Sequence, residues 1–173
     1  MPEVVSKTDD SYYAYLDPDV PETYFEALEQ LDAFVTSEGP FDAIMAFSQG
    51  AGLAILYMAR EKLKQVRPFK CAVLFAPTCT GDIFEWEKTG EKKLLKSLPG
   101  GEKIDIPVAL IWGERDGWRE EFESGSSLFD AKGLWQFYHA GGHEVPGPNV
   151  EGSLRGAIKT IRRATTQADL GPT

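Results

Sequence analysis

The feature that most constrains this chain is a serine, Ser48, at the junction of an expected strand and an expected helix. Residues 41–47 form a short apolar run typical of a buried strand, and residues 49–64 have a helical pattern. Small residues, Ala46 and Gly50, lie two positions before and two positions after the serine. This arrangement is typical of a nucleophile elbow, a sharp turn that holds its serine in a strained backbone conformation. A nucleophilic serine requires a base and an acid elsewhere in the chain.

Strand-like and helix-like segments alternate along the rest of the chain. Short apolar runs at residues 71–75, 107–112 and 134–138 are typical of strands that are buried on both faces. Helices are expected at residues 22–36, 84–97, 119–130 and 151–164, with a frayed tail at 165–173. The alternation predicts an α/β fold, a parallel sheet of four strands flanked by helices. We expect residues 1–173 to form one domain, with residues 79–105 as a cap segment.

Acidic and histidine residues follow two of these expected strands. Glu114 and Asp116 come after the run at 107–112, and His139 and His143 come after the run at 134–138. Because ligands bind at the carboxyl ends of parallel strands, we expect these residues near the serine. Histidine can take the serine proton near neutral pH, and a buried carboxylate can orient the imidazole. Serine, acid and histidine also follow one another in the order of α/β-hydrolases.

Each candidate has an alternative role. Ser48 can serve as a helix N-cap, a common role for serine before a helix. Asp116 is favoured over Glu114 because it lies further into the loop, where its side chain can turn toward a histidine. His143 is favoured over His139 because it lies in a glycine-flanked loop that can reach over the sheet. His139, at the strand end, is expected to be a core or supporting histidine.

Three motifs surround these candidate residues. They are Gly39-Pro40-Phe41-Asp42-Ala43 with Ala46-Phe47-Ser48-Gln49-Gly50-Ala51, then Trp112-Gly113-Glu114-Arg115-Asp116, and His139-Ala140-Gly141-Gly142-His143-Glu144-Val145-Pro146. Together they resemble the fungal FSH-type family of serine hydrolases within the α/β-hydrolases, and the match runs from about residue 22 to residue 160. The resemblance implies a catalytic triad of Ser48, Asp116 and His143, and ester or thioester hydrolysis without a metal or organic cofactor. It also implies a substrate class, acyl groups that are released beside fungal polyketide synthases.

The front of the chain departs from the family pattern. The family usually has glycine at the position of Ala46, where a methyl group is tolerable in the turn. The family also has strands before the elbow, whereas this chain shows only a short apolar stub at residues 3–5. The backbone N–H of Gln49 is the expected first oxyanion donor, and the loop that supplies the second is missing. We therefore expect an N-terminally shortened hydrolase with a bare edge on strand 41–47. That edge favours a homodimer. The missing front strands also leave the alternative of a hydrolase fold that has lost catalysis and kept a binding or dimerising role.

The expected cap segment offers apolar side chains for a substrate. Phe84, Trp86 and Leu95 are the candidate substrate-binding residues, since they are expected over the strand ends beside the elbow. The alternative is an ordinary amphipathic helix that covers the sheet and turns its lysines to water.

Composition excludes several other classes of protein. The formal net charge is −9, from 27 acidic and 18 basic residues, which disfavours a nucleic-acid partner. The two cysteines, Cys71 and Cys79, do not have the spacing of a metal site or of a disulfide framework. No stretch is apolar enough for a membrane span or a signal region, so we expect a cytoplasmic protein. The family resemblance implies a small-molecule ester or thioester as its substrate.

Overall fold

The chain folds around one parallel sheet of four strands. The computed structural model describes residues 13–78, 80–119, 123, 125–148 and 152–171. The strands lie in the order in which they occur in the chain, and each pairs in parallel with the next. They are β1 (Ala43–Phe47), β2 (Cys71–Phe75), β3 (Val108–Gly113) and β4 (Leu134–His139). The predicted α/β class and the four predicted strands are confirmed.

The helices agree with the sequence in part. They are α1 (Pro21–Glu38), α2 (Ser48–Leu63), α3 (Ile83–Thr89) and α5 (Ser153–Leu170), with single 3₁₀ turns at Pro99–Gly101 and Ser126–Leu128. The prediction of one helix over residues 84–97 is wrong, because Gly90 adopts a left-handed conformation that ends α3. The prediction of a frayed tail is also wrong for residues 165–170, which belong to α5, while residues 172–173 lie outside the described residues. The stretch at 119–130 lies partly outside the described residues.

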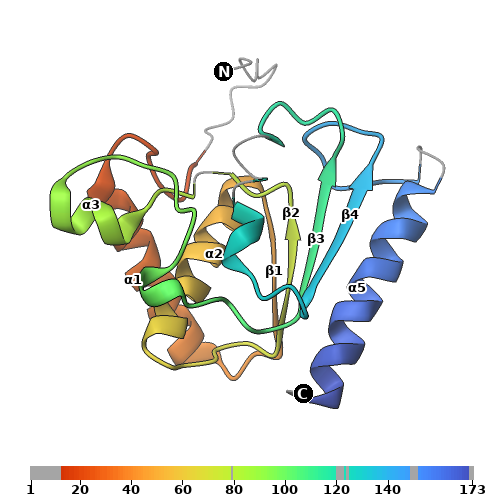
Figure 1. The fold of residues 1–173 in the computed structure, drawn as a ribbon, viewed down its shortest axis with the longest axis horizontal. Coiled ribbons are helices and arrows are strands. Elements are labelled where there is room, and N and C mark those ends of the chain that lie inside the picture. Colours follow the sequence, from red (N-terminus) through yellow and green to blue (C-terminus); the bar gives the residue numbers. More distant parts are fainter. Residues whose placement is uncertain (1–12, 79, 120–122, 124, 149–151, 172–173) are drawn as a thin grey trace.

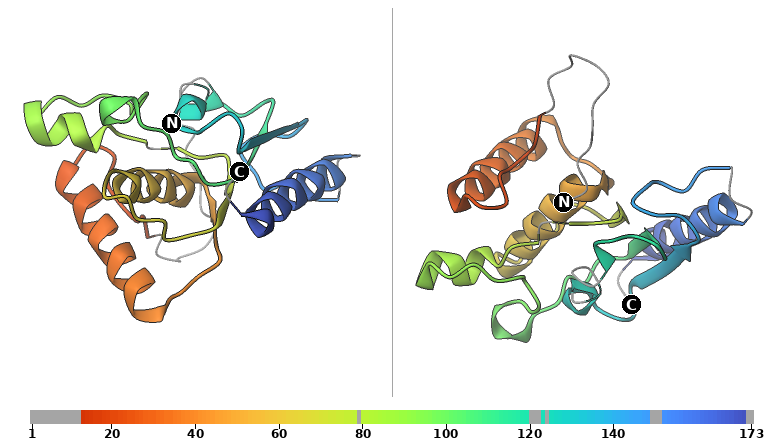
Figure 2. Two further views of the ribbon diagram at one scale, coloured as in Figure 1. Left: turned by 60° about the horizontal axis from the view of Figure 1, so that its bottom comes forward. Right: turned by 90° about the horizontal axis from the view of Figure 1, so that it is seen from above.

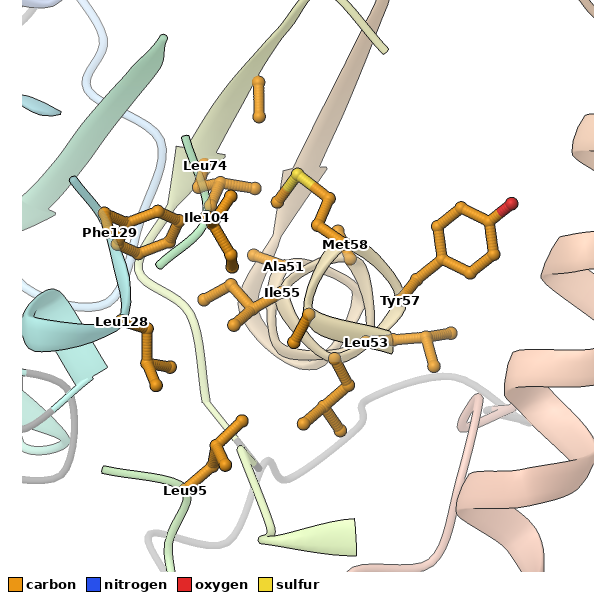
Figure 3. Close-up of a cluster of buried hydrophobic side chains, with 14 of the residues drawn as sticks. Ala51, Leu53, Ile55, Tyr57, Met58, Leu74, Leu95, Ile104, Leu128 and Phe129 are labelled. Carbon is orange, nitrogen blue, oxygen red and sulfur yellow. The ribbon is translucent and has the colours of Figure 1, made fainter. Parts of the chain in front are cut away.

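Helices cover the two faces of the sheet unequally. Figures 1 and 2 show α1 and α2 on one side of the sheet and α5 on the other. The helix α2 packs directly against β1 and β2, and α1 packs against the outside of α2. Most buried apolar side chains lie on this side, as Figure 3 shows around α2. A smaller cluster forms where α5 packs against β2, β3 and β4.

The strand β1 forms one edge of the described sheet. Its side chains alternate between half-buried and exposed, whereas every residue of β2 and β3 is buried. Met45 is 68% exposed and Phe47 is 40% exposed, on the face that α5 leaves uncovered at this edge. The expected bare edge is therefore present among the described residues. The apolar stub at residues 3–5 lies outside them.

Two further expectations concern cysteine and membrane segments. Cys71 is 4% exposed, and burial raises the pKa of its thiol, as expected for a structural cysteine. Cys79 lies outside the described residues. Among the helices that the structure describes, none is long and apolar enough to cross a membrane.

Candidate active site

The turn that carries Ser48 has the strained geometry expected of a nucleophile elbow. Ser48 has a φ of 54°, in the left-handed region that residues with a side chain rarely adopt. The helix α2 begins at this serine, and its N-cap position is Phe47, so the hydroxyl does not act as the N-cap. Instead, Ser48 Oγ lies 2.7 Å from Nε2 of His143. The turn thus presents the hydroxyl to an imidazole that is 95 residues away in the sequence.

The imidazole of His143 also contacts an acid. Its Nδ1 lies 2.9 Å from Oδ2 of Asp116, whose side chain is only 3% exposed. The other carboxylate oxygen of Asp116 accepts a hydrogen bond of 3.0 Å from the backbone N–H of Trp118. Glu114, the rival acid, is exposed. The structure therefore brings Ser48, His143 and Asp116 into one hydrogen-bonded chain, and leaves Glu114 and His139 outside it.

The loops that carry the acid and the histidine are joined tightly. The N–H of Arg115 donates to the carbonyl of Gly141 over 3.1 Å. Gly113 lies so close to the histidine loop that an added Cβ would be 2.2 Å from the carbonyl oxygen of Gly142 and 2.4 Å from that of Gly141. Only glycine fits at position 113, because the neighbouring atoms belong to the backbone of the histidine loop and cannot move aside as a flexible side chain can.

His139 supports the same loop from inside the protein. It is 2% exposed, and its Nδ1 accepts a hydrogen bond of 3.2 Å from the N–H of Gly141. Accepting at Nδ1 means that this nitrogen carries no proton, so the neutral ring carries its proton on Nε2. Its role is therefore to hold the turn that leads to His143, in line with the supporting role expected of it.

A cavity of about 1040 Å³ opens beside the elbow. Residues 14–19, which we call the strap, form one wall, and the first half of α1 forms another. Ser48, Gln49, Leu94 and Trp118 also belong to the lining. The strap lies against the elbow, so this side of Ser48 is covered by chain although the sequence offers no obvious oxyanion loop.

The structure places the three candidate substrate-binding residues away from this lining. Leu95 is fully buried and Trp86 is 8% exposed, and both belong to the main core cluster. Trp86 makes an edge-to-face contact with Tyr24 of α1, at 5.5 Å between ring centroids. Phe84 is half-buried against the same cluster. The described lining of the cavity contains none of these three, and contains Leu94 instead.

Sequence reasoning missed several residues that shape the site. Gly113, Gly141 and the strap were not expected to have a role. The glycines stood inside recognised motifs, but only the distance between two loops shows why glycine is needed there. The strap has no sequence motif that indicates a role. Its contacts with Gln49 join residues that are 33 and 34 positions apart, and a local pattern does not reveal such contacts.

Clusters of metal-ligating side chains are absent from the described part of the chain. No group of three or more histidine, cysteine, aspartate or glutamate side chains is placed there to hold a metal ion. The polar groups at the site are those of an acyl-transfer centre, namely a hydroxyl, an imidazole and a carboxylate.

Comparison with known proteins gives the family. A family model described as serine hydrolase (FSH1) matches residues 3–151. The chain belongs to this family. It is 30% identical to Esterase FPY3 of Fusarium mangiferae over 166 residues, which cover 94% of this chain and 74% of that protein. It is 28% identical to Hydrolase FUB4 of Fusarium oxysporum f. sp. lycopersici over 195 residues, covering 80% of this chain and 73% of that one.

Solved structures agree on the fold of this FSH1 family member. The α/β-hydrolase MGS-MChE2, from a metagenome of lagoon sediments in Morocco, superposes with a TM-score of 0.52 at 17% identity. The match covers 84% of this chain and 71% of that one. A solved protein of Agrobacterium vitis S4 gives a TM-score of 0.51 at 20% identity, with 87% and 69% covered. The α/β-hydrolase fold predicted from the sequence is confirmed.

Proposed function

We propose that this member of the FSH1 family is an esterase that works through a covalent acyl-enzyme. Ser48 Oγ attacks the carbonyl carbon of the ester, and Nε2 of His143 takes the hydroxyl proton. The C–O bond to the leaving group breaks, and His143 gives its proton to the departing oxygen. Water then attacks the acyl-enzyme with His143 as the base, which releases the acid and restores the serine.

Two other groups support these steps. Asp116 holds the ring of His143 with Nδ1 protonated and stabilises the imidazolium that forms. The backbone N–H of Gln49, directly after the nucleophile, donates to the oxyanion of the tetrahedral intermediate. Removal of one such donor costs about 2.7–4 kcal/mol in a well-studied hydrolase, so this N–H is a large part of the catalytic power expected here.

One observation carries the proposal. The hydrogen-bonded chain from Ser48 Oγ through His143 to Asp116 is unbroken, at 2.7 and 2.9 Å. These are distances at which a proton can pass between serine and imidazole. The named esterase among the relatives supports an ester as the substrate. A thioester would follow the same steps with sulfur as the leaving atom, and a polyketide acyl group stays a prediction from the family resemblance.

A fluorophosphonate probe tests the proposal, because it reacts covalently with activated serine hydroxyls. We expect labelling of the intact protein, loss of labelling in Ser48→Ala, and full labelling in Ser97→Ala, where an exposed serine is removed. Hydrolysis of p-nitrophenyl acetate is expected to follow the same order. Intact protein that stays unlabelled would leave the alternative, a hydrolase fold that binds or dimerises without catalysis.

Self-association is a separate proposal, supported by the exposed edge of β1. Two copies that pair along this edge would cover Met45 and Phe47 and satisfy backbone groups of the strand. Sedimentation velocity of the intact protein and of Met45→Lys tests this, because a lysine at the edge opposes pairing.

We also propose a single domain over residues 1–173 and a cytoplasmic location, and sequence composition is the support for both.

A further inference from the structure

The side chain of Gln49 links the elbow to the strap. Its Oε1 accepts hydrogen bonds from the N–H of Tyr15 at 2.8 Å and from that of Leu16 at 3.4 Å. Its Nε2 donates to the carbonyl oxygen of Leu16 at 2.9 Å. The carboxamide therefore bonds both polar groups of the Leu16 backbone, as a neighbouring strand would. The residue that follows the nucleophile thus fixes a segment more than 30 residues away in the sequence.

The strap is also fixed at its second half. The N–H of Asp17 donates to Oγ1 of Thr23 at 2.9 Å, and the carbonyl oxygen of Asp17 accepts from that hydroxyl and from the N–H of Val20. Asp19 forms an ion pair with Lys92, on the segment that follows α3. Between these points the side chain of Leu16 is buried in the core, at 3% exposure. The strap is thus a defined wall with an anchor at each end.

The cavity between the strap and α1 has apolar surface near the reactive hydroxyl. Tyr15 is 70% exposed, and its ring lies over the elbow, 3.4 Å from where a Cβ on Gly50 would be. Leu94 is 37% exposed and lines the same cavity from the opposite segment. The lining also contains charged side chains, of which Asp19 pairs with Lys92 and Lys93 pairs with Glu91, while Asp17 and Glu26 add carboxylates that disfavour an anionic chain. An uncharged hydrocarbon chain therefore suits the surface between Tyr15 and Leu94 better than a charged one.

We infer that this cavity binds the acyl part of the substrate, an uncharged apolar chain, and that the Gln49 carboxamide is a positioning group that holds the strap as its wall. The inference rests on the proposed function and deepens it. The backbone N–H of Gln49 serves the oxyanion, while its side chain orders the surface that selects the acyl chain. Each methylene group that a pocket buries increases the binding affinity about fourfold. The wall is therefore expected to set the preference of the enzyme for the length of the acyl chain.

The experiment compares p-nitrophenyl acetate with p-nitrophenyl octanoate. For the wild-type protein, kcat/KM is expected to be at least tenfold higher for the octanoate. In Gln49→Ala this ratio falls by tenfold or more, mainly through KM for the longer ester. Leu94→Glu keeps the tether but places a charge in the wall, and the ratio falls in the same way. The control is Leu154→Ala on α5, which lies outside the cavity lining and is about as exposed as Leu94. This variant is expected to leave the ratio unchanged.

Hydrogen exchange gives a readout that does not depend on activity. The amides of Tyr15 and Leu16 are expected to exchange slowly in the wild-type protein and in Leu94→Glu, and fast in Gln49→Ala. A wild-type protein without preference for the longer ester, or a ratio unchanged in both Gln49→Ala and Leu94→Glu, would overturn the inference. Wild-type protein that fails to react with fluorophosphonate contradicts the proposed function instead, and fast exchange at both wild-type amides contradicts the tether alone.

Discussion

Replacement of Gly113 by alanine tests whether the approach of two loops positions His143, the proposed general base. Gly113 is the last residue of β3 and pairs with His139 on β4, directly below the loop that leads to His143. An alanine Cβ at this position would lie 2.2 Å from the carbonyl oxygen of Gly142 and 2.4 Å from that of Gly141. Both neighbours are backbone atoms, so the histidine loop as a whole has to move.

The size of the movement follows from these distances. Contact between a carbon and an oxygen is normal only above roughly 3.2 Å, so the histidine loop must shift by about 1 Å. Misplacement by about 1 Å of a group that takes part in catalysis can cost about 100-fold in rate. We therefore expect kcat to fall by about 100-fold in Gly113→Ala, which corresponds to about 2.7 kcal/mol in the activation free energy.

Gly117→Ala is the matched control. Gly117 lies in the same acid loop, and a Cβ there would have no neighbour within 4 Å. The assay is the rate of p-nitrophenyl acetate hydrolysis together with the rate of fluorophosphonate labelling. Thermal unfolding and circular dichroism show whether Gly113→Ala remains folded. A folded Gly113→Ala protein that hydrolyses the ester as fast as Gly117→Ala would refute the argument that this approach sets the position of His143.

Three further predictions concern single side chains. His139→Asn keeps an acceptor near the position of Nδ1, and its kcat is expected to stay within about threefold of the wild-type value. His139→Leu leaves the buried N–H of Gly141 without its acceptor, and its kcat is expected to fall about tenfold. Steady-state kinetics of the two variants measures this difference. The free energy of unfolding of Ser48→Gly is expected to be about 1 kcal/mol larger than that of Ser48→Ala, because glycine adopts the left-handed conformation without strain. Urea unfolding of the two variants measures this difference. Burial raises the pKa of Asp105, but the hydrogen bonds and the positive charges of Lys62 and Arg67 together lower it more, so its pKa lies below the ordinary value in the folded state. This stabilisation is therefore present near neutral pH and is lost as the pH falls through the folded pKa, so Asp105→Asn is expected to be less stable than wild type near pH 7 and equal to it at strongly acidic pH in urea titrations.

The sequence predicted what depends on local pattern. Apolar runs located the strands, since a parallel sheet buries both faces of its inner strands and leaves a continuous signal. The order of Ser48, Asp116 and His143, each after its own strand, placed these side chains together because parallel strands end at the same edge. The elbow could be predicted because its serine and the small residues around it lie within five consecutive residues.

Contacts between distant segments could not be predicted in this way. Leu95 looked like a substrate contact because it is apolar and near the strand ends, but a short bridge between Gly81 and Leu94 turns Leu95 inward and leaves Leu94 at the cavity. Neighbouring residues on an extended segment face opposite sides, so an error of one position exchanges a core residue for a lining residue. The extra turns of α5 were missed because residues 165–170 are half-buried or exposed and carry no apolar stripe that would extend the helical pattern past Ala164.

The strain at Ser48 explains why so many contacts meet at the elbow. A left-handed serine costs roughly 1–2 kcal/mol and persists only where its surroundings determine it. Here the carbonyl oxygen of Ser48 accepts a hydrogen bond of 3.2 Å from the N–H of Thr78, which follows β2, while the side chain of Gln49 bonds the strap. These two contacts hold the turn from both sides without using the hydroxyl. The hydroxyl is thereby left to His143, and the segments that keep the turn strained also form walls of the cavity beside it.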